Sequence, residues 1–544
     1  MSGIDGYVLP SYITSKEDIR EDRSNIILYR KSFENVAKSF AYMHLKYEGV
    51  RSILISVDEI EKETAEPNFK IPYRGWDDYN NKKNHPFIKK YDISLSKKII
   101  HNLLNISKKE NILSVLLIGN AGVIPPSYYF NLNYLPFSNK QGDVKFKNEW
   151  ISSDILYASP DLDLKLNWAV GRISVKNPEE GRKIVAKYQK WYEDRNVVSE
   201  KGMIFFGGDT FLDKSYDGEL AFLAFQNSNA LVYPVKKYFQ SHNKFSGYHL
   251  IRSFKYDSAS LFLIFSHGLG DGFQLEHDFV YSRDILKVPY KKGLPLLLSP
   301  SCLGAGFDYD LMKVPHYRSE VSIGEAVLLS AGVGIGYIGA SQMTLSKVTS
   351  GVHQGFVDSV SLKAMPQFLL EFFKAHNSGS TRIADILIKA YSEFGNTVEI
   401  VDDKSLSSIV LFTLIGDPVM SLPKSTPLTS NNNFKGLNLI SKPNVFANNI
   451  PVFNKKERIK FEVPNINGVN KILISVRDLK KGRTLHAPKW YVPGDIIEII
   501  PKRYSTYLID SELKNGLLSR QFFKVGSKKS RDSGIKYKNT IIFK

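Results

Sequence analysis

The chain has 544 residues, of which 43% are hydrophobic and 24% charged, which is the balance of a globular rather than a disordered protein. Its single cysteine excludes a disulfide framework and a Cys-rich zinc site but leaves a thiol nucleophile open. Residues 425–544 hold 23 Lys and Arg against 8 Asp and Glu, and so carry most of the net charge of +18. This basic segment is either a solvated surface or a site for an anionic surface. No RNA-binding or helix-turn-helix motif accompanies it, so nucleic acid is not indicated as a partner.

The beginning of the chain and its most apolar run bear on location. Residues 1–24 contain acids and prolines where a signal peptide needs a continuous apolar core. We therefore expect an N-terminal extension there, and either a cytoplasmic protein or a processed form of a secreted one. The run Ala326–Ala340 is shorter than the roughly 20 residues that span a bilayer, so it predicts buried core and no membrane span.

Short apolar runs alternate with helical patterns through residues 25–424, which is typical of a mostly parallel sheet flanked by helices. We divide this α/β part into two subdomains, 25–200 and 201–424. The expected strands are Asn25–Tyr29, Ser52–Val57, Ser114–Ile118, Gly202–Phe206, Leu261–Phe265, Leu294–Leu298 and Gly334–Ile338. The expected helices have apolar residues three and four apart, and they are Ser32–Tyr47, Ser94–Asn105, Pro178–Tyr192, Gly218–Asn227, Ile323–Ser330 and Thr381–Phe394.

The polar, turn-rich stretch Ser421–Phe434 predicts a domain boundary. Beyond it, runs such as RIKFEVP, KILISVRDL, DIIEIIP and TYLID recur at short intervals, with Gly, Pro and Asn between them. This spacing predicts a small antiparallel β-sandwich in residues 425–544.

Two apolar runs end in side chains suited to catalysis, each followed by a glycine-rich loop. SASLFLIFSHGLGDGF contains His267, and KGLPLLLSPSCLGAGFD contains Cys302. Crevices in an open parallel sheet form beyond the carboxyl ends of its strands, so we expect both side chains at one rim. The imidazole can take the thiol proton as the sulfur attacks a carbonyl carbon. The main-chain NH groups of Gly268 and Cys302 are the expected oxyanion donors.

Six segments in order along the chain resemble the successive motifs of the gingipain family of cysteine peptidases, which is related to the caspases. They are SVLLIGNAGVIPP (114–126), SSDILYASPDLDLKLNWAVGRISVKNPEEG (152–181), IFSHG (264–268), LLLSPSCLGAGFD (296–308), SIGEAVLLSAGVGIGYIGAS (322–341) and LFTLIGDPVMSL (411–422). The resemblance covers most of the chain. It implies a caspase-like α/β fold followed by an immunoglobulin-like β-sandwich.

The resemblance also assigns roles to individual residues. It places Cys302 at the nucleophile and His267 at the histidine, which favours a catalytic thiol over a small buried apolar side chain. The family has an acidic residue that orients the histidine, and Asp209 in MIFFGGDTF follows the corresponding strand. The alternative for Asp209 is a turn-forming residue after two glycines.

Arginine-cleaving relatives carry an acid at the floor of the specificity pocket, and Asp217 lies at the matching spot with Glu219 close by. A buried carboxylate there would pair with Arg or Lys on the acyl side of the scissile bond. The alternative is that both are helix-start acids favoured by the helix dipole. Asp271 and Phe273, which follow the histidine, are candidates for the pocket wall.

The sequence therefore predicts a cysteine endopeptidase that hydrolyses polypeptides after Arg or Lys through an acyl-enzyme on Cys302. No cofactor or metal is expected for the chemistry, and a structural calcium ion is left open. The competing hypothesis is a catalytically silent, protease-like scaffold whose basic C-terminal domain binds an anionic surface or nucleic acid. The natural substrate, any activating cleavage and the oligomeric state are not specified by the sequence.

Overall fold

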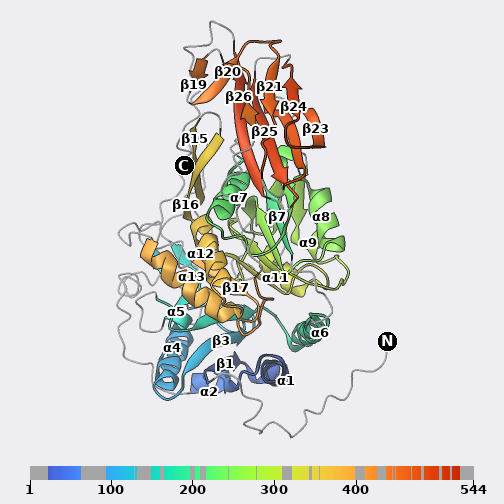
Figure 1. Ribbon diagram of the computed structural model, residues 1–544. Helices are drawn as coiled ribbons and strands as arrows, with labels where there is room; N and C mark the ends of the chain where they lie inside the picture. Colours follow the sequence, from blue (N-terminus) through green and yellow to red (C-terminus); the bar gives the residue numbers. More distant parts are fainter. Residues whose placement is uncertain are drawn as a thin grey trace.

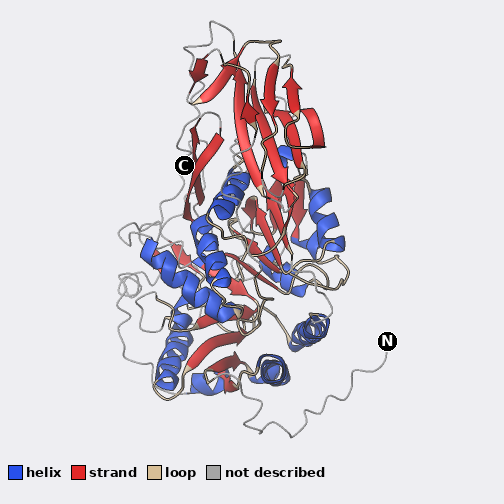
Figure 2. Ribbon diagram, viewed as in Figure 1, coloured by secondary structure: helices blue, strands red, loops and turns tan. Residues whose placement is uncertain are grey.

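The computed structural model describes an α/β body at one end of the molecule and a β-rich unit at the other (Figures 1 and 2). The residues described are 22–62, 93–127, 129–131, 149–159, 165–195, 202–208, 216–242, 244–276, 278–308, 321–341, 346–353, 356–397, 411–425, 437–443, 445–447, 449–466, 469–479, 483–501, 505–514 and 517–526.

The body is built on one ten-stranded sheet, whose eight inner strands are almost entirely buried, while the edge strands are partly exposed. In spatial order the strands are β2 (Ser52–Ser56), β1 (Ser24–Tyr29), β3 (Ile112–Ile118), β6 (Ala169–Ile173), β17 (Phe412–Ile415), β14 (Gly336–Ala340), β13 (Leu296–Ser299), β9 (Leu261–Phe265), β7 (Met203–Gly207) and β8 (Val235–Phe239).

The sheet consists of two blocks of parallel strands that meet in opposite directions. Every neighbouring pair is parallel except β17 and β14, which pair antiparallel from Ala340↔Phe412 to Tyr337↔Ile415. Strand β17 comes from the end of the α/β sequence, yet it pairs with β6 of the first block. The two expected subdomains thus share a continuous sheet, and we call the β14–β17 pairing its seam.

Helices flank this sheet (Figure 2). The longer ones are α1 (Glu34–Met43), α4 (Ile93–Ser107), α6 (Pro178–Asp194), α7 (Asp217–Asn227), α8 (Gly247–Tyr256), α12 (Met365–Asn377) and α13 (Ile383–Thr397). The shorter ones are α2 (Val57–Lys62), α5 (Ile155–Ala158), α9 (Ser282–Ile285) and α11 (Ile323–Leu329). A 3-10 turn η2 (Lys31–Phe33) and a π turn η3 (His44–Glu48) flank α1, and a second 3-10 turn, η5 (Gln240–His242), follows β8.

The β-rich unit is formed by two sheets around a common apolar core that includes Phe461, Ile474, Ile497 and Phe523. One sheet has the order β18 (Asn438–Leu439), β21 (Ile459–Glu462), β24 (Ile496–Ile499). The other has the order β15 (Ser346–His353), β16 (Phe356–Ala364), β26 (Leu518–Val525), β25 (Thr506–Leu513), β22 (Ile472–Asp478), β23 (Arg483–Tyr491), with β20 (Ile450–Phe453) on β26 and β19 (Val445–Ala447) on β20. The hairpin β15–β16 precedes residue 425, so the larger sheet draws on both parts of the sequence.

The structure confirms the mixed α/β architecture with a large, mostly parallel sheet, and all seven expected strands and six expected helices overlap observed ones. Helix α6 is capped at its amino-terminal end, because the Asn177 side chain accepts a hydrogen bond from the main-chain NH of Glu180 at 3.0 Å. The sequence analysis missed β6, β8, β17, α8 and α12. Two small sheets were also unforeseen: β10 (His267–Leu269) with β11 (Gly272–Leu275) and β12 (Asp278–Tyr281), and β4 (Tyr129–Asn131) with β5 (Glu149–Ile151).

A glycine permits the close approach of β6 and the chain after β17. A Cβ atom on Gly171 would lie 2.5 Å from the Gly416 carbonyl oxygen and 2.8 Å from Pro418 Cδ. We expect Gly171→Ala to lower the free energy of unfolding by about 1–3 kcal/mol, because the strands must move apart. Urea denaturation measures the change. Gly395→Ala in α13 is the matched control, since nothing lies within 4 Å of its Cβ position, and equal destabilisation of both variants would contradict this account.

Candidate active site

The segments that carry His267 and Cys302 follow two neighbouring parallel strands. Strand β9 pairs with β13 in a register that sets Leu263 beside Leu298. His267 begins β10 two residues after β9, and Cys302 comes three residues after the last residue of β13. Both segments therefore leave the sheet at the carboxyl-terminal edge of adjacent strands, which places them at one rim.

Serine side chains hold the two segments together beyond the strand ends. The Ser299 hydroxyl donates to the Ile264 carbonyl oxygen at 2.9 Å, and the Ser301 hydroxyl donates to the Ser266 carbonyl oxygen at 2.9 Å. These serines are buried. The bonds continue the β9–β13 contact for two further residues and end next to His267 and Cys302.

The main chains of Gly268 and Cys302 come into direct contact. A Cβ atom on Gly268 would lie 2.1 Å from the Cys302 carbonyl oxygen and 2.8 Å from the Cys302 main-chain nitrogen. Only glycine fits this approach without displacing the neighbouring chain. The structure thus brings together the two residues that the sequence analysis named as oxyanion donors.

Cys302 is partly exposed, so the lone thiol is not sealed in the apolar core. Leu303, the next residue, has a left-handed backbone with φ of 62°. This conformation turns the chain sharply directly after the thiol. A non-glycine residue in that region is uncommon and is held there by its surroundings.

His267 is partly buried at the same rim. Burial lowers the pKa of His267 below its ordinary value of 6.5, because the imidazolium loses hydration. The ring is therefore largely neutral at pH 7, which is the form that accepts a proton.

The amino-terminal end of α7 lies at this rim as well. The Gly218 NH donates to the Gly208 carbonyl oxygen at 3.0 Å, and the Gly208 NH donates to the Phe265 carbonyl oxygen at 3.2 Å. A Cβ atom on Gly218 would lie 2.6 Å from Phe265 Cβ. Asp217, which is fully buried, therefore lies near the end of β9. Asp209 follows Gly208 and falls outside the described residues.

Glu219 lies on α7 but has a different environment. Its carboxylate accepts hydrogen bonds from the NH and the hydroxyl of Ser241, at 2.7 and 2.6 Å, and forms an ion pair with Arg520 at 2.5 Å. The side chain has no exposed surface. Both carboxylate oxygens are thus engaged within the protein, and the structure offers no free Glu219 carboxylate to a substrate.

The two remaining pocket candidates lie on the hairpin that follows His267. Phe273 pairs with Gly268 across β10 and β11 and is fully buried. Asp271 lies in the turn between these strands, is nearly buried, and accepts a hydrogen bond from the Ser282 NH through its carbonyl oxygen at 2.8 Å. Phe273 therefore stands beside Gly268 and helps to fix its position.

A buried arginine supports the loop after Cys302. The Arg172 guanidinium donates to both oxygens of Asp154 at 2.8 and 2.7 Å, and to the carbonyl oxygens of Gly119 and Ile124. It also lies 4.5 Å from the centre of the Phe307 ring. The sequence analysis did not identify this partner set.

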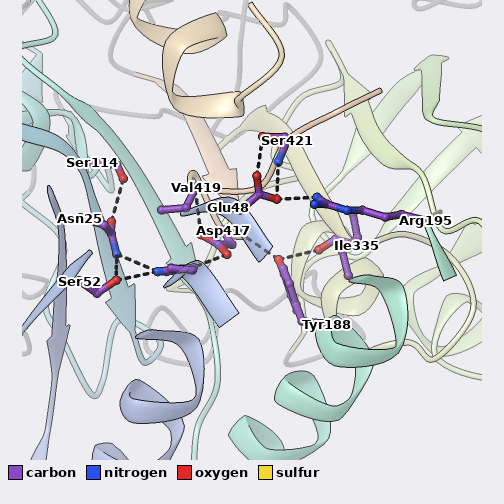
Figure 3. Close-up of polar contacts among 11 residues, drawn as sticks. Asn25, Glu48, Ser52, Ser114, Tyr188, Arg195, Ile335, Asp417, Val419 and Ser421 are labelled. Atoms are coloured by element: carbon purple, nitrogen blue, oxygen red, sulfur yellow. Dashed lines mark hydrogen bonds and ion pairs between the residues drawn. The ribbon is translucent and has the colours of Figure 1, made fainter. Parts of the chain in front are cut away.

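A second polar network, which sequence reasoning missed, lies at the seam of the sheet (Figure 3). The Tyr188 hydroxyl donates to the Ile335 carbonyl oxygen and accepts from the Asp417 NH, at 2.8 and 3.1 Å. The Asp417 carboxylate contacts the His44 ring at 2.9 Å. Nearby, Glu48 accepts from Arg195 and from Ser421 (Figure 3). In the sequence, only the segment LFTLIGDPVMSL, which contains Asp417, marks this part of the network.

Within the ranges that the structure describes, no group of three or more His, Cys, Asp and Glu side chains is arranged to hold a metal ion. Over the same ranges, no helix is both long and apolar enough to cross a membrane.

A thiol and an imidazole at one rim of an α/β sheet are the two groups with which cysteine peptidases attack a peptide bond. The model of peptidase family C25 matches residues 19–423, which is most of the chain. The chain therefore belongs to peptidase family C25, the gingipain family. This membership supports a cysteine peptidase and implies a polypeptide substrate.

Individual relatives are distant. A protein of Archaeoglobus fulgidus described as uncharacterized is 25% identical over 398 residues, which cover 68% of this chain and 87% of that protein. The complex of Porphyromonas gingivalis RgpB pro- and mature domains has a TM-score of 0.50 at 13% identity, over 92% of this chain and 100% of that one. The Arg specific cysteine proteinase gingipain R (RGPB) has a TM-score of 0.49 at 12% identity, over 93% and 98%. At such identities the structural likeness concerns the fold alone.

Proposed function

We propose that the chain is a cysteine endopeptidase in which Cys302 is the nucleophile and His267 the acid and base. The observation that carries the proposal is the direct main-chain contact between Gly268 and Cys302 at the carboxyl-terminal edge of β9 and β13. This contact brings the only thiol in the chain next to β10, the strand that begins with His267. The lowered pKa of His267 favours its neutral form at pH 7.

The chemistry follows from these groups. Neutral His267 takes the Cys302 proton as the sulfur attacks the peptide carbonyl carbon. The NH groups of Gly268 and Cys302 stabilise the oxyanion. The imidazolium then protonates the leaving amine, which leaves an acyl-enzyme on sulfur, and the neutral ring activates the water that hydrolyses it. None of these steps requires a metal ion, and calcium, where it binds, would have a structural role.

The finer assignments belong to the same proposal. Asp217, buried at the end of α7 beside the rim, is the candidate that would favour Arg or Lys on the acyl side of the scissile bond. Asp209 would orient His267. We also propose that the α/β body is caspase-like and that residues 425–544 form an immunoglobulin-like domain, on the strength of the sequence resemblance.

The direct test uses fluorogenic peptides ending in Arg, Lys or a neutral residue, in the presence of EDTA. We expect turnover of the basic peptides, and a loss of at least about a thousandfold in Cys302→Ala and in His267→Ala. Iodoacetamide provides an independent check, because the chain has no other cysteine to alkylate. Activity that survives Cys302→Ala would refute the assignment. Steeply salt-dependent binding to anionic vesicles, without any turnover, would favour the silent scaffold instead.

The pH profile tests the role of His267. Since burial lowers its pKa, the acidic limb of kcat/KM should have its midpoint below pH 6.5. The same shift means that the unfolded chain takes up a proton before the folded one does, so His267 also reduces stability as the pH falls through this range. An acidic limb centred above pH 6.5 would show that the imidazolium is stabilised rather than disfavoured.

Gly268 provides a test of the contact itself. An added methyl group would collide with the Cys302 carbonyl oxygen, so we expect Gly268→Ala to lower kcat/KM by about a hundredfold through loss of oxyanion geometry. Gly202→Ala is the control, because its Cβ position is open for 4 Å, and its rate should stay near that of the unaltered chain. If Gly268→Ala were fully active, these NH groups would have no part in stabilising the oxyanion.

A further inference from the structure

Helix α7 connects the candidate active site to the β-rich unit. Its first residues contact the end of β9 at the rim, and the rest of the helix lies against β7 of the central sheet and against β15 and β16 of the larger sheet in the β-rich unit (Figure 1). Bonds at both ends of the helix tie it to β26, a strand about 300 residues further along the chain.

The bond near the amino-terminal end is a buried ion-pair cluster. Arg520 on β26 donates to Glu219 on α7 at 2.5 Å, and through a second, forked interaction to both oxygens of Asp510 on β25 at 2.8 and 2.9 Å. Asp510 also contacts the His242 ring at 2.7 Å, and Ser241 donates to Glu219. Glu219, Asp510 and Arg520 are each at most 3% exposed.

The charges in this cluster stabilise one another. Burial tends to raise the pKa of Asp510, but the positive charge of Arg520 and the hydrogen bonds from His242 and Arg520 together hold that pKa well below its usual value. Conversely, the two carboxylates raise the pKa of Arg520 against the effect of burial. Both groups therefore remain charged. A planar guanidinium fixes the direction of each bond, so the cluster sets the position of Glu219 rather than merely attracting it.

The other end of α7 is held by neutral hydrogen bonds. The Gln226 side chain donates to the Leu518 carbonyl oxygen at 2.8 Å and accepts from the Leu518 NH at 2.7 Å. The helix is thus aligned along β26 between residues 518 and 520. Glu219 lies two residues from Asp217 and one from Gly218, so the Arg520 bond reaches almost to the rim.

From this geometry we infer that Arg520 is a positioning residue for the peptidase: by holding Glu219, it fixes the amino-terminal turn of α7, with Asp217, against the substrate side of the rim. The inference rests on the proposed function and extends it to the C-terminal unit. The sequence analysis considered Glu219 for direct substrate binding. In this inference Glu219 affects specificity indirectly, by holding the turn that carries Asp217. The Cys302–His267 pair lies on other segments, so Arg520 should affect substrate binding more than thiol reactivity.

Arg520→Lys tests the inference, because lysine keeps the charge but lacks the fork needed to reach both carboxylates. We expect kcat/KM for arginyl peptides to fall about tenfold, mainly through KM, since small displacements of a positioning element are costly. The rate of Cys302 alkylation and its pH profile should not change. Asp510→Asn should act in the same direction, because it releases the guanidinium from one side.

Lys237→Met is the matched control. Lys237 on β8 forms a partly buried ion pair across this interface, with Glu512 at 2.7 Å, and its ammonium lies over the ring of Phe222, which is beyond the first turn of α7. It should lower stability without changing KM. If Arg520→Lys is folded and keeps its KM, or if Lys237→Met raises KM equally, Arg520 has no positioning role.

Amide hydrogen exchange separates this inference from the proposed function. We expect faster exchange at residues 216–220 in Arg520→Lys than in Lys237→Met. If the chain hydrolyses no peptide but this difference is present, the proposed reaction is wrong while the coupling between β26 and the rim stands. If peptidase activity is normal and exchange is the same in both variants, the coupling is wrong.

Discussion

The parallel pairing of β9 with β13 is the constraint on which the candidate site depends. Neither strand carries a reactive side chain within the sheet, and both are fully buried. Their register, set by main-chain hydrogen bonds and apolar packing, determines where the chain emerges at the rim. The serine bonds beyond the strand ends extend this register to Gly268 and Cys302. The positions of Gly268 and Cys302 therefore follow from the packing of the core.

At the seam between β14 and β17, polar groups need hydrogen-bond partners where two blocks of strands meet. Tyr188 bonds to the chain before β14 and to the chain after β17, so one hydroxyl spans the seam. Asp417 is fully buried and contacts His44, which is also fully buried. Buried polar groups with complete hydrogen bonding favour one arrangement over others, since any alternative pairing would leave them unsatisfied. Residues that are distant in the sequence therefore help to specify how β14 and β17 pair.

How far the sequence could predict this structure depends on the range of the interactions. Leu261–Phe265 was predicted with its observed bounds because five consecutive apolar residues between turn formers are a local pattern. Strand β6 was missed because Gly171 and Arg172 break the apolar run, and the reasons for both residues lie elsewhere in the fold. Gly171 makes room for the Gly416 carbonyl, and Arg172 bonds Asp154. Likewise, His267 and Cys302 could be proposed from strand ends, whereas the environment of Glu219 could not.

Glu219 shows why local reading is insufficient for charged residues. An acid in the first turn of a helix is favoured by the helix dipole whatever it contacts, so its presence there carries little information. Its partner Arg520 lies 301 positions away on a strand that, by its own pattern, is simply part of a β-sandwich. Removing the two charges from water costs much of the free energy that their attraction provides, so the pair adds little net stability. Separating them is nevertheless strongly unfavourable, because each charge would then be buried without a partner. Selection for stability alone would be served equally by apolar residues in these places. An ion pair that fixes direction is therefore better explained by a need for alignment, and the element that it aligns is the helix whose first turn borders the candidate active site.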